Sequence, residues 1–323
     1  MGDNRVMRRM LVMAAAGLTA AVACAQDYPL QPVKLLVGFS PGGGLDISCR
    51  HWAERLGSRL KQPVVVENRP GASGEISIKQ AVAAKPDGYT LVCLSGSNTI
   101  SSAKAQPPFD IRTDVAPIIQ MTHFTFVLYV NPKLPAKTLA ELIAYSKANP
   151  GTLNYGSVGT GSTPHLAMEY LKLRTGLDAV HIPYKGTAQT AAAAIAGDIE
   201  IGLDAIAAVK PHFDAGTLRP IAVVSAGRTP MLPNVPGMRE SGVADVDIGS
   251  FSGIAAPART PPAVVLRLNR ELNAVLAEPE TRTLFFTQGY EVAGGTPQDF
   301  ARVLAAEVAQ WSGVVHAAKI TFD

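Results

Sequence analysis

The chain has 323 residues, of which 47% are hydrophobic and 17% are charged, so a globular protein with a large core and about two domains is expected. Arg5, Arg8, Arg9 and Asp3 give the N-terminal segment +2 (three arginines less one aspartate) of a formal net charge of +3, which leaves +1 for the remainder. That balance leaves no basic patch for nucleic acid, and the six histidines lack the spacing of metal ligands. No nucleic-acid partner, metal or other cofactor is therefore expected.

Residues 1–25 have the pattern of a secretory signal. Arginines precede an apolar run at 10–22, and the run ends in the triplet A-C-A, which matches an A-x-A cleavage site. The run is too short to span a bilayer as a helix. We therefore expect export to the periplasm and cleavage directly after the leader. Twin-arginine export through Arg8-Arg9 and lipidation at Cys24 are the weaker alternatives.

Strands and helices alternate in the first part of the chain. Strands are expected at 33–39, 64–67 and 89–94, and helices at 46–60 and in a segment that ends near Lys85. This alternation predicts parallel pairing with right-handed crossovers, which is typical of a doubly wound sheet.

The same alternation starts again in the middle of the chain. It begins with a strand near 126–131 and a helix at 138–148, and further strands are expected at 154–157, 180–182, 199–203 and 219–224.

A last strand is expected at 247–255, and after it only helical patterns follow, at 263–276, 280–288 and 297–318. Helices without a sheet of their own must bury their apolar stripes on an existing sheet, so we expect them to pack on the first unit.

Two doubly wound α/β domains joined by two crossing strands are the expected architecture. The first domain comprises 26–125 and 250–323, and the second comprises 126–249. Such a chain forms a hinged clamshell. Its ligand cleft should lie beyond the carboxyl ends of the strands.

The stretch GFSPG matches the G-x-S-x-G pattern of serine hydrolases and places Ser40 at the nucleophile position. In that motif, the backbone N–H of the next residue forms half of the oxyanion hole. Here the next residue is Pro41, which has no N–H. The match is therefore interpreted as accidental, and no catalytic residue is assigned.

Two glycine-rich loops are better suited to binding an anion than to presenting a nucleophile. Residues 41–44, PGGG, open into a helix that Asp46 is expected to cap, and residues 155–165, YGSVGTGSTPH, open into a second helix. Backbone N–H groups at a helix N-terminus can approach a ligand closely and favour negative charge. The pair of loops predicts a shared cleft for a small carboxylate.

A secreted α/β serine hydrolase is the alternative function, with Ser40 or Ser157 as nucleophile and His165 as base. A histidine in the first turn of a helix is more often structural, and the sequence places no partner acid. Cys49 and Cys93, the two cysteines beyond the leader, either pair in an oxidising compartment or are two small buried residues.

Several sequence motifs, taken in chain order, resemble those of the Bug family, the solute-binding receptors of tripartite tricarboxylate transporters. They are PVKLLVGFSPGGGLD (32–46), QPVVVENRPGASG (62–74), KPDGYTL (85–91), LNYGSVGTGSTPHLA (153–167), VHIPYKGTAQT (180–190) and GTP (295–297). The resemblance implies a two-domain periplasmic-binding-protein clamshell that binds carboxylates and related metabolites. It implies a monomer that works with membrane components of a tripartite transporter or with a sensor protein.

Carried onto this sequence, the resemblance implies ligand contacts at the loops that follow the strands. These residues are Ser40, Gly43, Gly44, Asp46, Ser95, Ser97, Ser157, Thr160, Gly161, Ser162, Thr163 and Asp204, with Tyr184 near the cleft mouth. Lys185 either pairs with a ligand carboxylate or is a solvated surface charge. Asp204 either accepts a hydrogen bond from the ligand or caps the following helix.

The sequence departs from the usual family pattern at the first loop and at the cysteines. Ser40 stands where an apolar residue or proline is common, and Leu45 where threonine or alanine is common. Cys49 and Cys93 stand where small apolar residues are common. The resemblance therefore implies the class of ligand but not a particular one.

Overall fold

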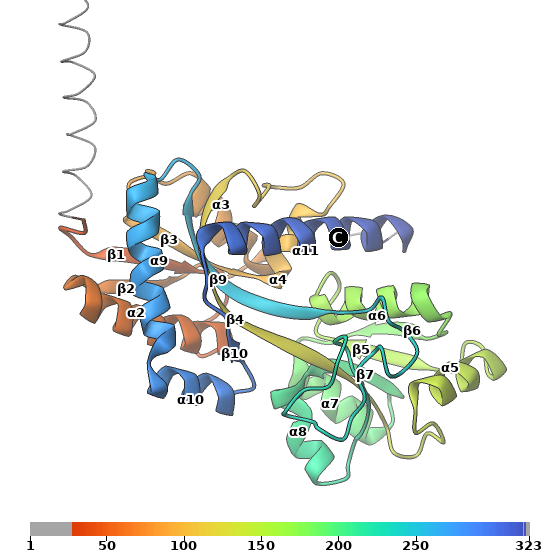
Figure 1. The fold of residues 1–323 in the computed structure, drawn as a ribbon. Coiled ribbons are helices and arrows are strands. Elements are labelled where there is room, and N and C mark those ends of the chain that lie inside the picture. The colour runs from red at the N-terminus through yellow and green to blue at the C-terminus, as the bar shows by residue number, and fades with distance from the viewer. Residues whose placement is uncertain (1–27, 319, 321–323) are drawn as a thin grey trace, which may run out of the picture.

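The computed structural model describes residues 28–318 and 320, and the expected export leader lies outside them. Two α/β lobes are joined by two long strands (Figure 1). The strands are hydrogen-bonded in the order β2-β1-β3-β9-β4-β7-β5-β6, and β8 and β10 pair with β4. No helix among the described residues is long and apolar enough to cross a membrane.

The first lobe contains three parallel strands and the helices that follow them. The strands are β1 (Val33–Val37), β2 (Val64–Asn68) and β3 (Thr90–Ser95), and the helices are α2 (Gly44–Leu60), α3 (Glu75–Val82) and α4 (Gly96–Ser102). A 3-10 turn, Ala72–Gly74, precedes α3. The expected strand 33–39 therefore ends at Val37. Helix α4 was not predicted, because its serine-rich stretch is typical of a loop, and a capping box between Ser95 and Asn98 fixes its start.

The two crossing strands are β4 (Val115–Val130) and β9 (Gly249–Pro257), and they are antiparallel. β4 pairs with β9 up to Thr125, and from Phe126 onward it pairs with β7 and β8 of the second lobe. The prediction that this strand starts near 126 was wrong. A proline usually argues against a strand interior, but Pro117 is tolerated here at a shift in the register between β4 and β9.

The second lobe repeats the parallel arrangement. It contains β5 (Asn154–Ser157), β6 (Val180–Pro183), β7 (Ile201–Ala205) and β8 (Arg219–Val223), with helices α5 (Leu139–Ala148), α6 (Thr163–Thr175), α7 (Thr187–Ala196) and α8 (Ile206–Asp214). β5 lies between β6 and β7 in parallel register, whereas β8 is antiparallel to β4. The carboxyl ends of β5 and β7 and of β1 and β3 therefore lead into the loops between the lobes.

The C-terminal segment returns to the first lobe. It contains α9 (Pro262–Ala277), α10 (Pro279–Thr287), a two-residue strand β10 (Glu291–Val292) and α11 (Pro297–Ala317). The short strand corrects the expectation that this segment adds no strand, because β10 pairs with β4. Two residues are too few to show an alternating pattern.

The C-terminal helices cover different parts of the core. α9 and α10 share an apolar cluster with α2 and β1, whereas α11 buries Phe300, Leu304 and Trp311 in a cluster that includes residues of both lobes. α11 contacts α4 in the first lobe and α6 in the second, so it spans the junction (Figure 1). α11 therefore packs against both lobes beside the crossing strands.

Candidate functional site

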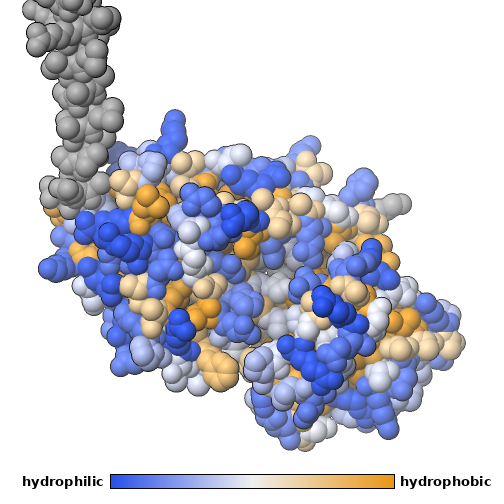
Figure 2. All heavy atoms as spheres, viewed as in Figure 1, coloured by the Kyte–Doolittle hydropathy of each residue, from blue (hydrophilic) through white to orange (hydrophobic). Residues whose placement is uncertain are grey.

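A cavity of about 600 Å³ lies between the two lobes, bordered by both crossing strands. Its walls come from the starts of α2, α4, α6 and α7, from the end of β7, and from β4 and β9. The space-filling view shows a surface hollowed where the lobes meet (Figure 2). This is the position predicted for the cleft.

Several helix N-termini border the cavity, among them those of α2, α6 and α7. The residues that cap α2, α6 and α7 all line it: Gly43, Ser162 and Gly186. Among the described residues, the backbone N–H groups of Gly44, Leu45, Thr163 and Thr187 have no hydrogen-bond acceptor. Free N–H groups and the positive ends of three helix dipoles make an environment that favours an anion.

Hydroxyl groups add donors between these helix starts. Ser97, Thr163 and Ser250 line the cavity, and their hydroxyls make no hydrogen bond to the described residues. No arginine, lysine or histidine is among the lining residues, whose only ionisable side chains are Asp204 and Tyr290. An anion here would be held by backbone and hydroxyl donors rather than by a cation.

Apolar side chains form the rest of the wall. The aromatic residues Phe39, Phe124, Phe126, Phe251 and Tyr290 line the cavity together with Leu45. Phe124 contacts both Phe126 and Tyr290 edge to face, with ring centroids 5.5 and 5.2 Å apart. Such a wall favours a ligand with an apolar body as well as an anionic end.

Asp46 supports the first glycine loop from behind. The structure corrects the expectation that it caps α2, because the helix begins at Gly44 with Gly43 as the capping residue. The buried Asp46 carboxylate accepts hydrogen bonds from Gly42 N (2.8 Å), Asn68 Nδ2 (2.7 Å) and Arg50 Nε (3.0 Å). Burial opposes its ionisation, but the hydrogen bonds outweigh burial and lower the pKa of Asp46. The carboxylate therefore fixes the loop and does not face the cavity.

Asp204 lies at the end of β7 and borders the cavity. Its two oxygens accept hydrogen bonds from Tyr129 Oη (2.8 Å) and Thr187 Oγ1 (2.7 Å). The helix-cap alternative is wrong, because α8 starts after Ala205 and has no side-chain cap. Burial raises the pKa of Asp204 to about 6, against the opposing effect of these two hydrogen bonds.

The structure brings some of the predicted ligand residues together and separates the others. Those that line the cavity are Gly43, Gly44, Ser95, Ser97, Ser162, Thr163 and Asp204. Those that do not line it are Ser40, Asp46, Ser157, Thr160, Gly161 and Tyr184. Lys185 is also exposed outside it, as expected for a solvated surface charge.

Some lining residues were not predicted from the sequence. Thr187, Ser250 and the aromatic wall belong to this group. The signal that could have found Thr187 was the glycine before a helix start in the stretch PYKGT, which repeats the device of the first loop.

The candidate hydrolase residues do not form a catalytic triad. Ser40 is exposed, and among the described residues no histidine hydrogen-bonds to it. Ser157 is buried, and its Oγ lies 2.7 Å from Nε2 of His181. His165, the predicted base, instead accepts a hydrogen bond at Nδ1 from the backbone N–H of Gly161. Burial and the neighbouring His165 lower the pKa of His181 to about 4, and no carboxylate hydrogen-bonds to this ring among the described residues. The Ser157–His181 contact thus lacks the acid that a triad needs.

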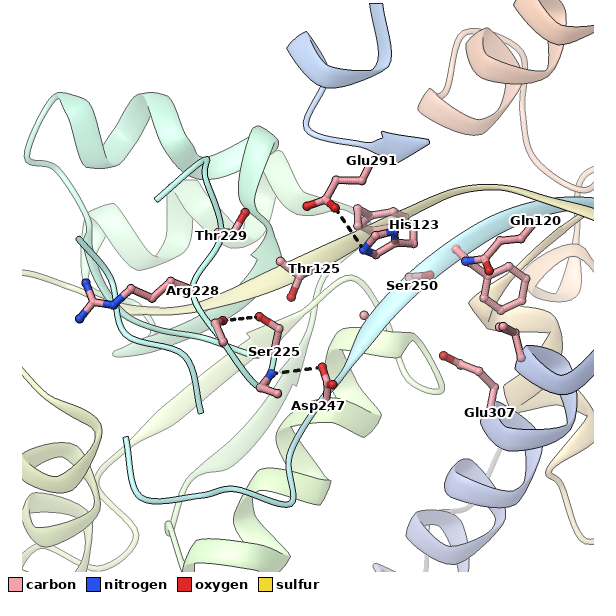
Figure 3. A pocket seen from close by; sticks show the side chains of 16 residues that line it. Gln120, His123, Thr125, Ser225, Arg228, Thr229, Asp247, Ser250, Glu291 and Glu307 are labelled. Carbon is pink, nitrogen blue, oxygen red and sulfur yellow. Dashed lines mark hydrogen bonds and ion pairs between the residues drawn. The ribbon is translucent and has the colours of Figure 1, made fainter. Parts of the chain in front are cut away.

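A second cavity, also about 600 Å³, adjoins the same crossing strands (Figure 3). Three carboxylates line it, those of Asp247, Glu291 and Glu307. Glu291 lies 3.6 Å from His123, and the cation of Arg228 is paired with Glu240. The described residues hold no group of three or more side chains suited to a metal ion. This acidic lining disfavours an anionic ligand.

A two-lobed α/β structure with crossing strands and an anion-suited cavity at the junction is typical of solute-binding proteins. Residues 48–320 match the family model described as the tripartite tricarboxylate transporter family receptor. The chain is 34% identical to Protein BugT of Bordetella pertussis over 308 residues, covering 94% of each chain. The chain therefore belongs to this receptor family, and the prediction from its motifs is confirmed.

Solved structures agree with this assignment. The structure of R. palustris Rpa4515 with adipate has a TM-score of 0.79 and 34% identity, over 91% of this chain and 99% of that one. MatC from Rhodopseudomonas palustris with bound malate has a TM-score of 0.76 and 26% identity, over 89% and 100%. The periplasmic binding protein BugD has a TM-score of 0.75 and 30% identity, over 91% and 99%. The predicted fold class is confirmed, and the protein is a receptor rather than an enzyme.

Proposed function

We propose that this receptor captures a small carboxylate with an apolar body in the cavity between its lobes, and releases it chemically unchanged. One observation carries the proposal. Unpaired N–H groups of three helix starts face a cavity that has aromatic walls and no cationic side chain. Adipate and malate bound to two relatives support a carboxylate.

The ligand is held from both sides of the cleft. Gly44 and Leu45 offer donors from the first lobe, and Thr163 and Thr187 offer them from the second. Neither lobe alone desolvates a charged ligand, so binding closes the cleft about β4 and β9. We place the domain boundaries where these strands change lobe, with 26–125 and 250–323 in one domain and 126–249 in the other.

Export and partners belong to the same proposal. The protein acts in the periplasm after its leader is cleaved near Ala25, and it acts as a monomer. Its partners are the membrane components of a tripartite transporter or a sensor protein. The family assignment supports the transporter partner.

The first test is a thermal-shift screen of ligand-stripped protein against short dicarboxylates, adipate, aromatic acids, amino acids, amines and neutral sugars. Carboxylates with apolar bodies should raise the Tm most, and calorimetry should give one site per chain. Prolonged incubation should leave the ligand intact. Stabilisation by amines or neutral sugars alone would contradict the proposed ligand class, and a hydrolysis product lost in Ser40→Ala would contradict the receptor.

Closure has its own test. Small-angle scattering should show a smaller radius of gyration with a saturating ligand from the screen than without it. An unchanged radius would count against closure while leaving the binding result in place.

A further inference from the structure

Two cysteine side chains meet inside the first lobe. Cys49 lies in α2 and Cys93 in β3, and both are buried, with exposed fractions of 0% and 2%. Their Sγ atoms are 2.7 Å apart. Two thiols attract each other only weakly, since S–H is a poor donor and sulfur a poor acceptor. A hydrogen bond of this kind does not explain so close an approach.

The elements around the pair hold the two residues face to face. Side chains alternate along β3, so Cys93 and Leu91 point into the cluster beneath α2 while Val92 and Leu94 enter the other core cluster. Cys49 and Trp52 lie in that same cluster, in the first half of α2. The fold thus brings together two residues that are 44 positions apart in the sequence.

We infer that Cys49 and Cys93 form a disulfide bond in the mature protein. The compartment proposed above is oxidising, which favours the bond. The bond would tie the start of α2, which carries Gly43 and Gly44, to the end of β3, which leads to Ser95. It would therefore brace two walls of the cavity from behind, outside the ligand's reach.

The bond must form before the core closes. Burial first, and then the neighbouring Cys93 thiol, raises the pKa of Cys49 in the folded protein, so little thiolate exists there. In a partly folded chain, one cysteine thiolate attacks a sulfur of an external disulfide and releases one external thiol. The second cysteine loses its proton and displaces the other. The two protein thiols lose two electrons and two protons, and the external disulfide becomes two thiols.

The test uses the full chain, isolated from whichever cell fraction holds it. The protein is reduced in guanidinium and refolded in oxidised and reduced glutathione. Free thiols of the refolded protein are then alkylated with excess N-ethylmaleimide in denaturant at near-neutral pH, where a free thiol reacts. Neither Cys49 nor Cys93 should react. A tryptic digest should contain peptides 35–50 and 80–104 joined, and reduction should separate them. Folded protein that takes up maleimide at both positions would overturn the inference.

Matched variants separate the bond from simple packing. In Cys93→Ala, the Cys49 peptide should carry maleimide. Reduction should lower the Tm of the parent by on the order of 5 °C and leave the Cys49→Ala/Cys93→Ala variant unchanged. A parent whose Tm does not respond to reductant, or a double variant that responds equally, would contradict the inference. These readouts measure sulfur bonding and stability, so they do not depend on the proposed ligand.

Discussion

The two cavities beside the crossing strands have the same volume and opposite electrostatic character. Each measures about 600 Å³, and Phe124, Ser250 and Phe251 border both. The cleft presents unpaired N–H groups and hydroxyls, whereas the second cavity presents three carboxylates. Size alone therefore does not identify the ligand site. The direction of the helix starts and the sign of the lining charge do, because an anion needs donors that cost little to preorganise.

Valine substitutions at two glycines test this comparison most strongly. Gly43 lines only the cleft and Gly227 lines only the second cavity, and neither has a left-handed φ. An added Cβ meets only Ser40 O at 3.4 Å in Gly43 and nothing within 4 Å in Gly227. Gly43→Val should weaken ligand binding by about 2 kcal/mol, roughly 30-fold, because the side chain occupies the approach to the N–H groups. Gly227→Val should bind like the parent in calorimetry.

The outcome at these two glycines can also reverse the assignment. If Gly227→Val lost binding and Gly43→Val kept it, the ligand would have to be placed in the second cavity. Backbone strain does not complicate the result, because Gly43 has φ −73°, which any residue adopts. The left-handed residue of this loop is Gly42, with φ 80°.

The apolar wall gives a smaller effect that depends on the ligand. Leu45 lines the cleft and not the second cavity. Leu45→Ala should weaken binding of carboxylates with apolar bodies by about 1 kcal/mol, through lost buried area. Malate, which has little apolar surface, should bind this variant and the parent alike. Equal losses for all ligands in calorimetry would show that Leu45 acts through the loop's structure instead.

The sequence predicts the glycine loops of the cleft better than its walls. The runs PGGG and GTGSTP indicate helix starts with accessible backbone. The cavity is indeed lined by residues of both runs: Gly43, Gly44, Ser162 and Thr163. Phe124 and Ser250 could not be predicted, because their exposure to the cleft depends on the pairing of β4 with β9. That pairing includes register shifts that no local pattern shows.

The role of Asp46 and the full length of β4 were also not predictable from local sequence patterns. A carboxylate near a helix start suggests a cap, but Asp46 instead binds back to Gly42 because the loop folds over it. The alternation of strands and helices predicted both lobes. The first part of β4 was not predicted, because Pro117 within it argues against a strand.

Asp204 should make binding pH-dependent. Burial raises its pKa to about 6, so lowering the pH from 8 to 5 removes a negative charge at the border of the cleft. The affinity for a ligand that stays anionic should increase roughly fivefold, on the order of 1 kcal/mol. Calorimetry of Asp204→Asn should show no such change. His181, whose pKa is lowered to about 4, stays neutral over this range.

The stability of the unliganded protein should follow the same titration. Because the folded-state pKa of Asp204 lies above the usual value of about 4, the folded protein holds this proton more tightly than the unfolded chain. Its contribution to the free energy of unfolding is complete below pH 4 and is lost as the pH rises through about 6. A difference between the parent and Asp204→Asn that grew more favourable to the parent with rising pH would contradict the shift.

The smallest effect is expected in the second cavity. Glu291 lines it, is about half exposed (56% of its side chain) and lies 3.6 Å from His123 across the pairing of β10 with β4. Surface pairs of this kind contribute about 0–1 kcal/mol, so Glu291→Gln should fold normally and unfold at nearly the same temperature.

If the ligand binds in the cleft, its affinity should change by less than about twofold, because solvent ions screen a charge outside the site. If the ligand instead occupied the second cavity, removing one of three carboxylates there would tighten its binding severalfold, and calorimetry at low salt would detect the gain. Glu291→Gln and the two glycine variants therefore both test which cavity holds the ligand. Glu291→Gln does so through a gain in affinity, which cannot be mistaken for a folding defect.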